Sequence, residues 1–314
     1  MKFIDLFCGI GGFRLALESR GLECVFSSEI DPHARRAYAN NFGETPSGDI
    51  TEVPSCKIPR HDVLCAGFPC QSFSISGKRG SLGDGRGRLF FEIARIAAHC
   101  RPSVLILENV KNILSIDGGG AMRRIEATLC ETGYRVRAFL LNSSFFGVPQ
   151  ARERVYFLAV RKDLMPADEL GQILPPTASL EKIYLEDALD PDPDPALLID
   201  RDFHIAKPES GVSRALKPIR VGHVNKGGQG ERIYSPKGHA ITQSAHGGGA
   251  GAKTGLYATA RGVRRLSVDE CKRVMGFPAR HRVGAGSQGY RQLGNAVVPG
   301  MIGAVFGSCG HFLD

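Results

Sequence analysis

The sequence contains no tryptophan and no two cysteines at a Cys-x-x-Cys spacing. The cysteines number nine, and this odd count, with their spacing, argues against a disulfide framework and against a zinc knuckle or ribbon. No run of about 18 apolar residues occurs, so we expect no transmembrane span. Met1 leads almost directly into an apolar run, without the basic and then apolar leader of a secreted protein. We therefore expect a protein of the reducing cytoplasm that contains no metal and binds no membrane.

Charged side chains are present in quantity but are unevenly distributed. The 314 residues include 40 Lys and Arg against 32 Asp and Glu, a net charge of +8. Residues 166–200 have a net charge of −8, whereas residues 201–314 have +11. A basic C-terminal third indicates a polyanionic partner, although a basic surface alone is weak evidence for nucleic acid. The length and the 42% hydrophobic content allow one large domain, or a large domain with a small one.

The first 165 residues alternate short apolar runs with amphipathic ones. Helices are expected between strands, and the strands are predicted over 2–7, 24–28, 62–66, 103–107, 135–141 and 155–160. This alternation predicts an α/β fold with a doubly wound, mostly parallel sheet. In such sheets ligands bind at the carboxyl ends of the strands, which is where we look for a site.

The character of the sequence changes near residue 166. The Asp-Pro repeats of 190–195 are typical of a stiff linker, and 207–262 is rich in Gly, Ser and basic residues, as in a small, loop-dominated domain. A helix is predicted over 267–275, where a Ser and a Glu three residues apart form a capping box. The apolar segment 289–312 is expected to dock back on the first domain.

The turn after the first predicted strand is rich in glycine, with Gly9, Gly11 and Gly12 opening a helix. Glycines let a ligand approach the backbone, and a helix start offers free N–H groups. Glu29 follows the second strand, where a carboxylate can accept hydrogen bonds from both hydroxyls of a ribose. The spacing is not Gly-x-Gly-x-x-Gly, so a pyrophosphate is not specifically indicated. The turn therefore predicts a nucleoside cofactor, and the alternative is a plain tight turn.

Cys70 follows a buried strand directly, within Gly67–Ser74, which is where site residues belong. Pro69 stiffens the backbone before it. We interpret Cys70 as a nucleophile; the alternative is a small buried residue, as for Cys65.

The segment 71–88 is long and combines glycines with basic side chains. A lid is predicted, because glycines suit closure and positive charges suit phosphate contacts. The alternative is a disordered surface loop. The basic residues are Lys78, Arg79, Arg86 and Arg88.

Two further motifs lie at strand ends. Glu108 ends the strand over 103–107 and is a candidate acid in the same cleft. Arg152 and Arg154 precede the strand over 155–160 and, being two residues apart, point to the same side. A surface ion pair or a solvated strand edge is the alternative for each motif.

In this order, these motifs resemble those of the DNA (cytosine-5)-methyltransferases, and the resemblance covers nearly the whole chain. It implies a class I S-adenosylmethionine-dependent, Rossmann-like catalytic domain over 1–185, a loop-rich target-recognition domain over 186–267, and a returning segment over 268–314. The matching stretches are Phe3–Gly12, Gly67–Ser74, Glu108–Val110, Gln150–Arg154, Arg264–Pro278 and Gly289–Pro299.

The resemblance also implies a mechanism. The Cys70 thiolate would attack C6 of a flipped-out cytosine, which activates C5 to accept a methyl group from S-adenosylmethionine, leaving S-adenosylhomocysteine. Glu108 would hydrogen-bond N3 and the exocyclic amine, and Arg154 would hold O2 with Arg152 close by. The sequence does not identify the base that removes the C5 proton.

The resemblance assigns residues to both ligands. For the cofactor they are Phe7, Gly9, Gly11, Gly12, Glu29, Ile30, Asp49, Ile50, Pro69, Leu89, Asn295 and Val297. For DNA they are Ser74, Ser76, Lys78, Arg86, Gln229, Gly230, Arg232, Tyr234 and Thr242.

The likeness is greatest to family members that methylate the first cytosine of GCGC. Ile30 and His246 stand where those members have aromatic residues, and Ala151 replaces a basic one. These departures concern ligand contacts and not the reaction.

The implied partner is double-stranded DNA, bound by a monomer between two basic walls. A restriction endonuclease that cuts the same DNA site would be the second enzyme of a restriction-modification system, without forming a stable complex with this protein. The alternatives are an RNA cytosine-5 methyltransferase on the same fold and an inactive DNA-binding regulator. A dinucleotide oxidoreductase is disfavoured, because it would have no use for the Pro-Cys motif.

Overall fold

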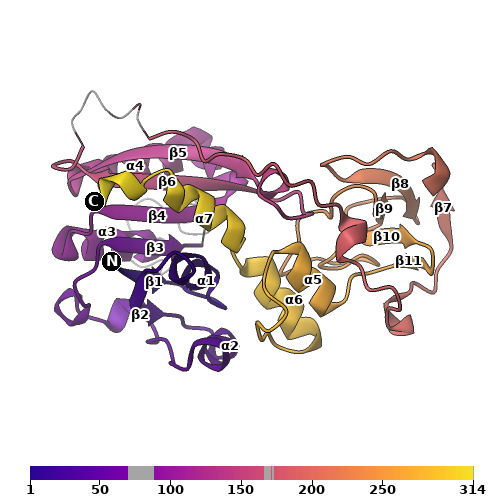
Figure 1. The fold of residues 1–314 in the computed structure, drawn as a ribbon, viewed down its shortest axis with the longest axis horizontal. Helices are drawn as coiled ribbons and strands as arrows, with labels where there is room; N and C mark the ends of the chain where they lie inside the picture. The colour runs from indigo at the N-terminus through magenta and orange to yellow at the C-terminus, as the bar shows by residue number, and fades with distance from the viewer. Residues whose placement is uncertain (70–87, 166–170, 172, 314) are drawn as a thin grey trace.

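The computed structural model describes residues 1–69, 88–165, 171 and 173–313. A large layered part and a smaller part lie side by side, joined by a group of short helices (Figure 1). Within these described ranges, no helix is long and apolar enough to cross a membrane.

The large part is built on a six-stranded sheet with the strand order β2-β1-β3-β4-β6-β5. Its strands are β1 (Lys2–Leu6), β2 (Glu23–Ser28), β3 (Val63–Gly67), β4 (Val104–Val110), β5 (Tyr134–Asn142) and β6 (Glu153–Arg161). Strands β2, β1, β3 and β4 pair in parallel, and only β6 runs antiparallel to its neighbours β4 and β5. The doubly wound, mostly parallel sheet predicted from the sequence is confirmed.

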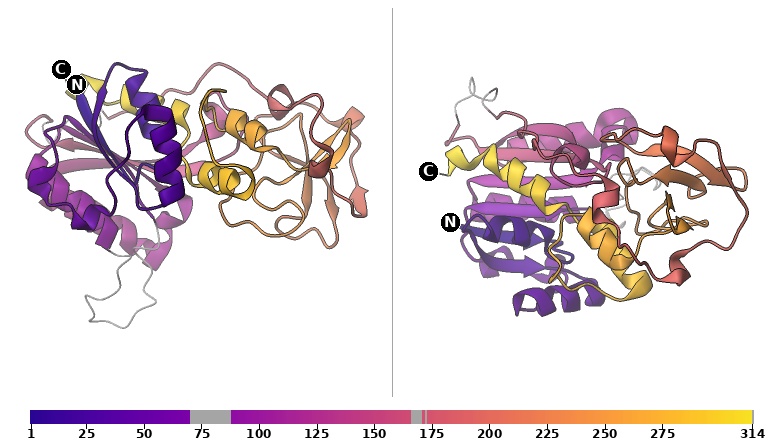
Figure 2. Two further views of the ribbon diagram at one scale, coloured as in Figure 1. Left: turned by 90° about the horizontal axis from the view of Figure 1, so that it is seen from below. Right: turned by 45° about the vertical axis from the view of Figure 1, so that its right-hand side comes forward.

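Both faces of this sheet are buried, because successive strand residues point to opposite sides. In β1, Phe3 joins one core cluster and Ile4 the other. Helices α1 (Gly12–Glu18) and α7 (Pro299–Gly307) cover the first face, with α2 (Pro32–Phe42) beside α1, and α3 (Arg88–Cys100) and α4 (Gly120–Glu131) cover the second (Figures 1 and 2).

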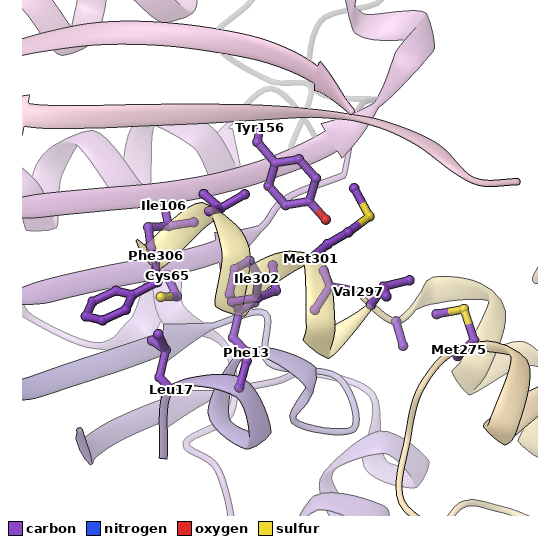
Figure 3. Packing of buried hydrophobic residues seen from close by; sticks show 14 of the residues in the cluster. Phe13, Leu17, Cys65, Ile106, Tyr156, Met275, Val297, Met301, Ile302 and Phe306 are labelled. Carbon is purple, nitrogen blue, oxygen red and sulfur yellow. The ribbon is translucent and has the colours of Figure 1, made fainter. Parts of the chain in front are cut away.

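The C-terminal helix α7 packs on the large part, as the apolar segment 289–312 predicts. Its residues Met301, Ile302 and Phe306 share one buried cluster with Phe13 and Leu17 of α1 and with residues of β3, β4 and β6 (Figure 3). Each fully buried aliphatic side chain contributes about 1.5–3 kcal/mol. The close approach requires a glycine at position 12, since a Cβ there would lie 2.7 Å from a methyl group of Val297.

The smaller part contains a five-stranded sheet with the order β11-β10-β9-β8-β7. Its strands are β7 (Phe203–Ile205), β8 (Ile219–Val224), β9 (Arg232–Ser235), β10 (Leu256–Thr259) and β11 (Gly262–Arg264). Its core is a small separate cluster made by Val212, Val221, Val224, Ile233, Leu256 and Val263. The short strands and long connections agree with the loop-dominated composition.

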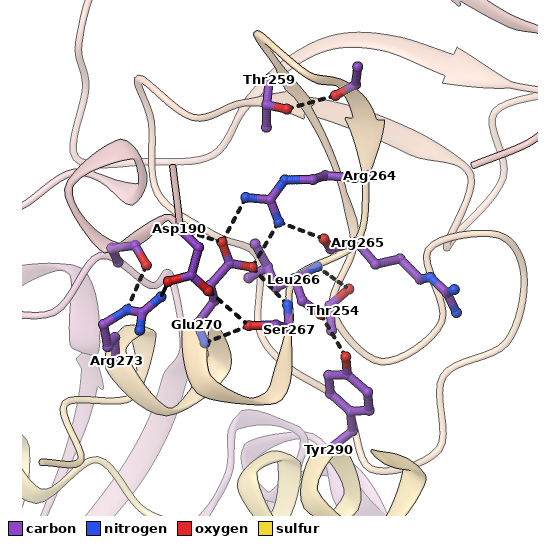
Figure 4. Close-up of polar contacts among 12 residues, drawn as sticks. Asp190, Thr254, Thr259, Arg264, Arg265, Leu266, Ser267, Glu270, Arg273 and Tyr290 are labelled. Atoms are coloured by element: carbon purple, nitrogen blue, oxygen red, sulfur yellow. Dashed lines mark hydrogen bonds and ion pairs between the residues drawn. The ribbon is translucent and has the colours of Figure 1, made fainter. Parts of the chain in front are cut away.

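Helix α5 (Val268–Val274) joins the two parts and is held by a buried ion pair (Figure 4). Arg264 donates two hydrogen bonds of 2.8 and 2.7 Å to Glu270, and both side chains are at most 1% exposed. The predicted capping box is confirmed, because Ser267 and Glu270 exchange hydrogen bonds of 3.0 and 2.7 Å. Burial alone would raise the pKa of Glu270, but hydrogen bonds from Arg264 and from backbone N–H groups hold the pKa below its usual value.

Part of the acidic linker belongs to this junction. The Asp190 backbone N–H donates to Glu270, and its carboxylate pairs with Arg273 at 2.5 Å (Figure 4). Asp192 likewise pairs with Arg261. The negative charge of 166–200 is therefore partly matched by basic residues of the C-terminal third.

Candidate active site

A cavity of about 370 Å³, here called the main cavity, lies at the carboxyl ends of β1, β3 and β4. This is the edge of the sheet where the sequence predicts a site. The predicted residues that line it are Phe7, Gly9, Glu29, Ile30, Pro69, Leu89, Glu108, Arg152, Arg154 and Asn295.

The turn after β1 is shaped by left-handed backbone. Phe7 and Gly9 both have φ of 56°, and Gly11 has φ of 86°. Gly11 must be a glycine for a second reason, since a Cβ there would lie 2.2 Å from the ring of Phe42. A non-glycine residue such as Phe7 adopts this conformation rarely, and such residues cluster at functional sites.

Glu29 joins the turns that follow β1 and β2. Its carboxylate accepts hydrogen bonds from the backbone N–H of Gly9 at 2.9 Å and of Asp31 at 2.8 Å. Burial raises the pKa of Glu29, and these two hydrogen bonds oppose the rise. The carboxylate is thus fixed at the wall of the cavity.

A second cavity of about 340 Å³ adjoins the main one and shares Phe7, Glu29, Ile30 and Leu89 with it. Asp49 and Ile50, both predicted cofactor residues, line this second cavity. Asp49 accepts hydrogen bonds from the N–H and hydroxyl of Thr51 at 2.9 and 2.8 Å.

Three of the predicted cofactor residues line neither cavity. Gly11 packs against Phe42, and Gly12 packs against Val297. Their contacts bring α1, α2 and the returning segment together behind the site.

An ion pair also lines the main cavity. Glu108 is 8% exposed, and its carboxylate lies 3.0 Å from Nε of Arg154. Glu108 is paired across the sheet with Gly67, so it stands beside the segment that leads through Pro69 to Cys70. An acid, an arginine and Pro69 therefore line the same cavity.

The two arginines of the Gln-x-Arg-x-Arg motif have different environments. Arg154 pairs with Glu108, whereas the guanidinium of Arg152, a residue only 2% exposed, donates to the backbone carbonyls of Gly294, at 3.1 Å, and Ala296, at 2.8 Å. It also reaches the carbonyl of Gln243 at 3.4 Å. Burial, with the nearby charge of Arg154, lowers the pKa of Arg152 to about 9.

Several residues of the cavity wall were missed by the sequence reasoning. Asn109 is 1% exposed and donates to the carbonyl of Phe68 at 2.9 Å, which fixes the start of the Pro-Cys segment. Its position beside Glu108 was a usable signal. Helix α6 (Gly286–Asn295) contributes Gln288, Arg291 and Gln292, which no local motif distinguishes from an ordinary polar helix face.

Of the predicted DNA residues of the smaller part, Gln229 and Gly230 lie on the loop before β9, Arg232 and Tyr234 lie in β9, and Thr242 follows it. Gln229 and Arg232 are exposed, and the loop 225–231, here called the recognition loop, connects β8 with β9. The carboxylate of Glu231 organises this loop by accepting hydrogen bonds from the side chain of Asn225 and the N–H of Gly228, both at 2.9 Å.

The recognition loop also contacts the glycine-rich segment 244–253, here called the glycine loop. Gly230 has φ of 81°, and a Cβ there would lie 2.4 Å from the carbonyl oxygen of Gly248. Gly251 donates to the carbonyl of Gly230 at 2.8 Å. Only glycine at position 230 allows the two loops to touch.

Two other predicted DNA residues make internal contacts. Thr242 donates its hydroxyl to the carbonyl of Ala151 at 2.7 Å, next to Arg152. Tyr234 is half-buried, with its ring 6.3 Å from that of Tyr257.

Five predicted site residues, Cys70, Ser74, Ser76, Lys78 and Arg86, lie outside the described residues. Pro69, the last described residue before Cys70, lines the main cavity. In the part of the chain that the structure describes, no group of three or more His, Cys, Asp or Glu side chains could hold a metal ion.

Comparison with known proteins gives a consistent result. The family model for C-5 cytosine-specific DNA methylases matches residues 1–311. The chain is 48% identical over 300 residues to the type II methyltransferase M.HhaI of Haemophilus parahaemolyticus, covering 95% of this chain and 90% of that protein. It is 38% identical to M.MspI of Moraxella sp, covering 95% of this chain and 67% of that protein.

Solved structures agree in fold. The Dnmt2 methyltransferase of S. pombe superposes with a TM-score of 0.71 at 20% identity, covering 98% of this chain and 97% of that one. A DNA modification methyltransferase described as putative, from a prophage of E. coli, gives a TM-score of 0.72 at 19% identity, covering 100% and 99%.

Proposed function

The chain belongs to the C-5 cytosine-specific DNA methylase family, and from this premise we propose that it flips a cytosine out of duplex DNA and methylates C5 through a covalent bond between Cys70 and C6. The chain is a DNA cytosine-5 methyltransferase of the restriction-modification type, and the proposal concerns its mechanism and its target. The observation that carries it is the Glu108–Arg154 pair, which lies beside the segment leading to Cys70 on the wall of the main cavity.

A methyltransferase of this family takes S-adenosylmethionine as its methyl donor. The fit of the residues supports binding in the two adjoining cavities, because a nucleoside needs an apolar surface for its base and an acceptor for its ribose. Phe7 and Ile30 would flank the adenine, Glu29 would accept from the ribose hydroxyls, and Asp49 would accept from the adenine amine. Asn295 and Val297 of the returning segment would close the site.

The reaction needs a nucleophile because C5 of cytosine is itself unreactive. The Cys70 thiolate would add to C6, so that the C5–C6 π electrons become available at C5 for the methyl group. Glu108 would hydrogen-bond N3 and the exocyclic amine, while Arg154 holds O2 and, through its ion pair, orients Glu108. A base, not identified, then removes the C5 proton, the C5–C6 double bond re-forms, and the thiolate leaves.

Access to C6 and C5 requires the cytosine to leave the helix. Gln229 would fill the vacated space from the recognition loop, with Ser76 approaching from the catalytic side. Arg232 would read guanine through its bidentate fork, and Thr242 would support the loops. We propose the first cytosine of GCGC as the target, supported by the match to M.HhaI at 48% identity.

The remaining expectations belong to the same proposal. The chain would divide into a catalytic domain over 1–185, a target-recognition domain over 186–267 and a returning segment over 268–314. It would act as a monomer in the cytoplasm, where it protects DNA from a restriction endonuclease that cuts the same site. No metal takes part in the proposed chemistry.

The test uses a duplex carrying 5-fluorocytosine in GCGC, with S-adenosylmethionine present. Fluorine at C5 cannot leave as a proton does, so the wild-type protein should form a stable covalent complex, whereas the Cys70→Ala variant should form none. Absence of a complex on every fluorocytosine duplex would overturn the mechanism. A complex on another site only would reject GCGC, and preferential reaction with an RNA strand of the same sequence would reject duplex DNA as the substrate.

A further inference from the structure

Lys253 is the last residue of the glycine loop, and its charge suggests a contact with DNA. The structure gives its ammonium group another partner. Nζ donates to the hydroxyl of Ser287 at 2.7 Å and approaches the Ser287 carbonyl oxygen at 3.3 Å. Ser287 belongs to the first turn of α6.

Two features make this contact unusual. Lys253 has φ of 70°, a left-handed conformation that few non-glycine residues adopt. Its positive charge also lies at the start of a helix, where the helix dipole disfavours a cation. A left-handed backbone and a cation at a helix start are both unfavourable, and their occurrence at one residue indicates that the contact between Lys253 and Ser287 is required.

The other end of the glycine loop is also attached to α6. A Cβ at Gly294 would lie 2.5 Å from the backbone nitrogen of Ala245, so the loop lies directly on the last turn of the helix. The Arg152 guanidinium donates to the carbonyls of both Gln243 and Gly294, and so links the residue before the glycine loop to the end of the helix. The loop is therefore fixed to both ends of α6, and Lys253 makes the attachment at the start of the helix.

Helix α6 is at the same time a wall of the main cavity, through Gln288, Arg291, Gln292 and Asn295. On its other side the glycine loop touches the recognition loop at Gly230. A continuous set of contacts thus runs from the recognition loop through the glycine loop and α6 to the cavity.

We propose that Lys253 is a positioning residue that ties the glycine loop to α6, so that binding of DNA and binding of the cofactor strengthen each other. The proposal rests on the proposed function, which assigns DNA to the loops and the cofactor to the cavity. By linkage, the factor by which DNA tightens the cofactor equals the factor by which the cofactor tightens DNA.

The experiment measures the dissociation constant of S-adenosylhomocysteine with and without a saturating GCGC duplex. The constant without DNA divided by the constant with DNA, here called the coupling ratio, should exceed one in the wild-type protein. It should fall about fivefold in Lys253→Met. Lys253→Arg, which keeps a donor, should restore the ratio. Ser287→Ala, which leaves the backbone carbonyl, should lower it less, and the double variant should be no worse than Lys253→Met alone.

The control is Lys162→Met, since Lys162 also donates to a backbone carbonyl, that of Cys130, but lies far from both loops. It should leave the ratio unchanged. Measuring DNA affinity at several salt concentrations distinguishes the Lys253–Ser287 contact from a contact between Lys253 and a DNA phosphate. Loss of one phosphate contact lowers the salt slope, the slope of log affinity against log salt concentration, by about 0.9. The Lys253→Met variant should keep the wild-type slope.

A wild-type ratio of one, a wild-type ratio retained in Lys253→Met, additive effects of the two substitutions, or a lowered salt slope would each overturn the proposal. Covalent trapping of 5-fluorocytosine by the wild-type protein tests the proposed function separately. Trapping together with any of those four results would mean that only the role of Lys253 is wrong.

Discussion

The two sheets of the molecule are stabilised in different ways. The six-stranded sheet lies between two large apolar clusters, and its strands contribute to both of them. Among the described residues, the five-stranded sheet has a separate core of six buried apolar residues, and its loops are fixed by polar contacts and close glycine approaches, such as those of Glu231 and Gly230. The proposed chemistry is thus placed at well-packed strand ends, whereas the proposed DNA contacts lie on or beside loops that packing alone would not hold.

The largest expected effect is at Glu108, at the end of a strand of the six-stranded sheet. Glu108→Gln keeps the size of the side chain but removes the acid, so methyl transfer should fall by about 10²–10⁴-fold. Because the fold and loops are untouched, binding of S-adenosylhomocysteine and of the duplex should change little. Single-turnover methyl transfer and equilibrium binding check both points; equal losses in rate and binding would contradict a role in the chemical step.

The next effect concerns stability. Ile302→Ala removes a fully buried side chain of α7 and should lower the free energy of unfolding by about 2–5 kcal/mol. Urea unfolding measures this value. A matched substitution in the small core, Ile233→Ala, should cost less, because fewer neighbours surround the cavity it leaves. A larger loss of unfolding free energy for Ile233→Ala than for Ile302→Ala would contradict the proposed contrast between the two cores.

Arg232, which directly follows the recognition loop, should affect selectivity rather than stability. Arg232→Ala should remove about 1–3 kcal/mol of discrimination at one base pair of the site, corresponding to one bidentate contact with guanine. Competition between GCGC and duplexes altered at single positions measures this discrimination. Lys226→Ala, which changes an exposed residue of the recognition loop, should instead weaken binding equally on all sequences.

The smallest effect is a dependence of stability on pH. His281 is 3% exposed and lies against the carbonyl oxygen of Ile10 at 2.9 Å, and burial lowers its pKa to about 4. The unfolded chain, with a His pKa near 6.5, binds the proton first as the pH falls. His281 therefore contributes full stability above pH of about 6.5 and loses about 2 kcal/mol between pH 7 and pH 5.

Urea unfolding at those two pH values checks this sign. The His281→Asn variant should be less stable at pH 7 and should show a smaller loss on acidification. An unchanged pH dependence in this variant would assign the effect to other groups, such as His239, whose pKa is also lowered by burial.

The comparison also explains which features the sequence could predict. The strands of the large sheet were predictable because their apolar runs are local, and Glu29 and Glu108 were found because they follow such runs. The backbone and side-chain contacts of Arg152 and Lys253 could not be predicted, since their partners lie 142 and 34 residues away along the chain. Gln288, Arg291 and Gln292 were missed because a polar helix face has no local mark of the cavity it lines.

The return of α7 to the first sheet has a consequence for biosynthesis. The strands of the large sheet are complete at Arg161, but α7, which covers one face of the sheet together with α1, begins only at Pro299. During translation, the part of the cover that α7 gives to Cys65, Ile106 and their neighbours is therefore missing until more than 130 further residues have been made. Domains usually fold as they leave the ribosome, with the N-terminal parts first, and exposed apolar surface invites aggregation. We expect the nascent chain to be most vulnerable over this interval, and truncation before Pro299 to yield insoluble protein even though every strand of the sheet is present.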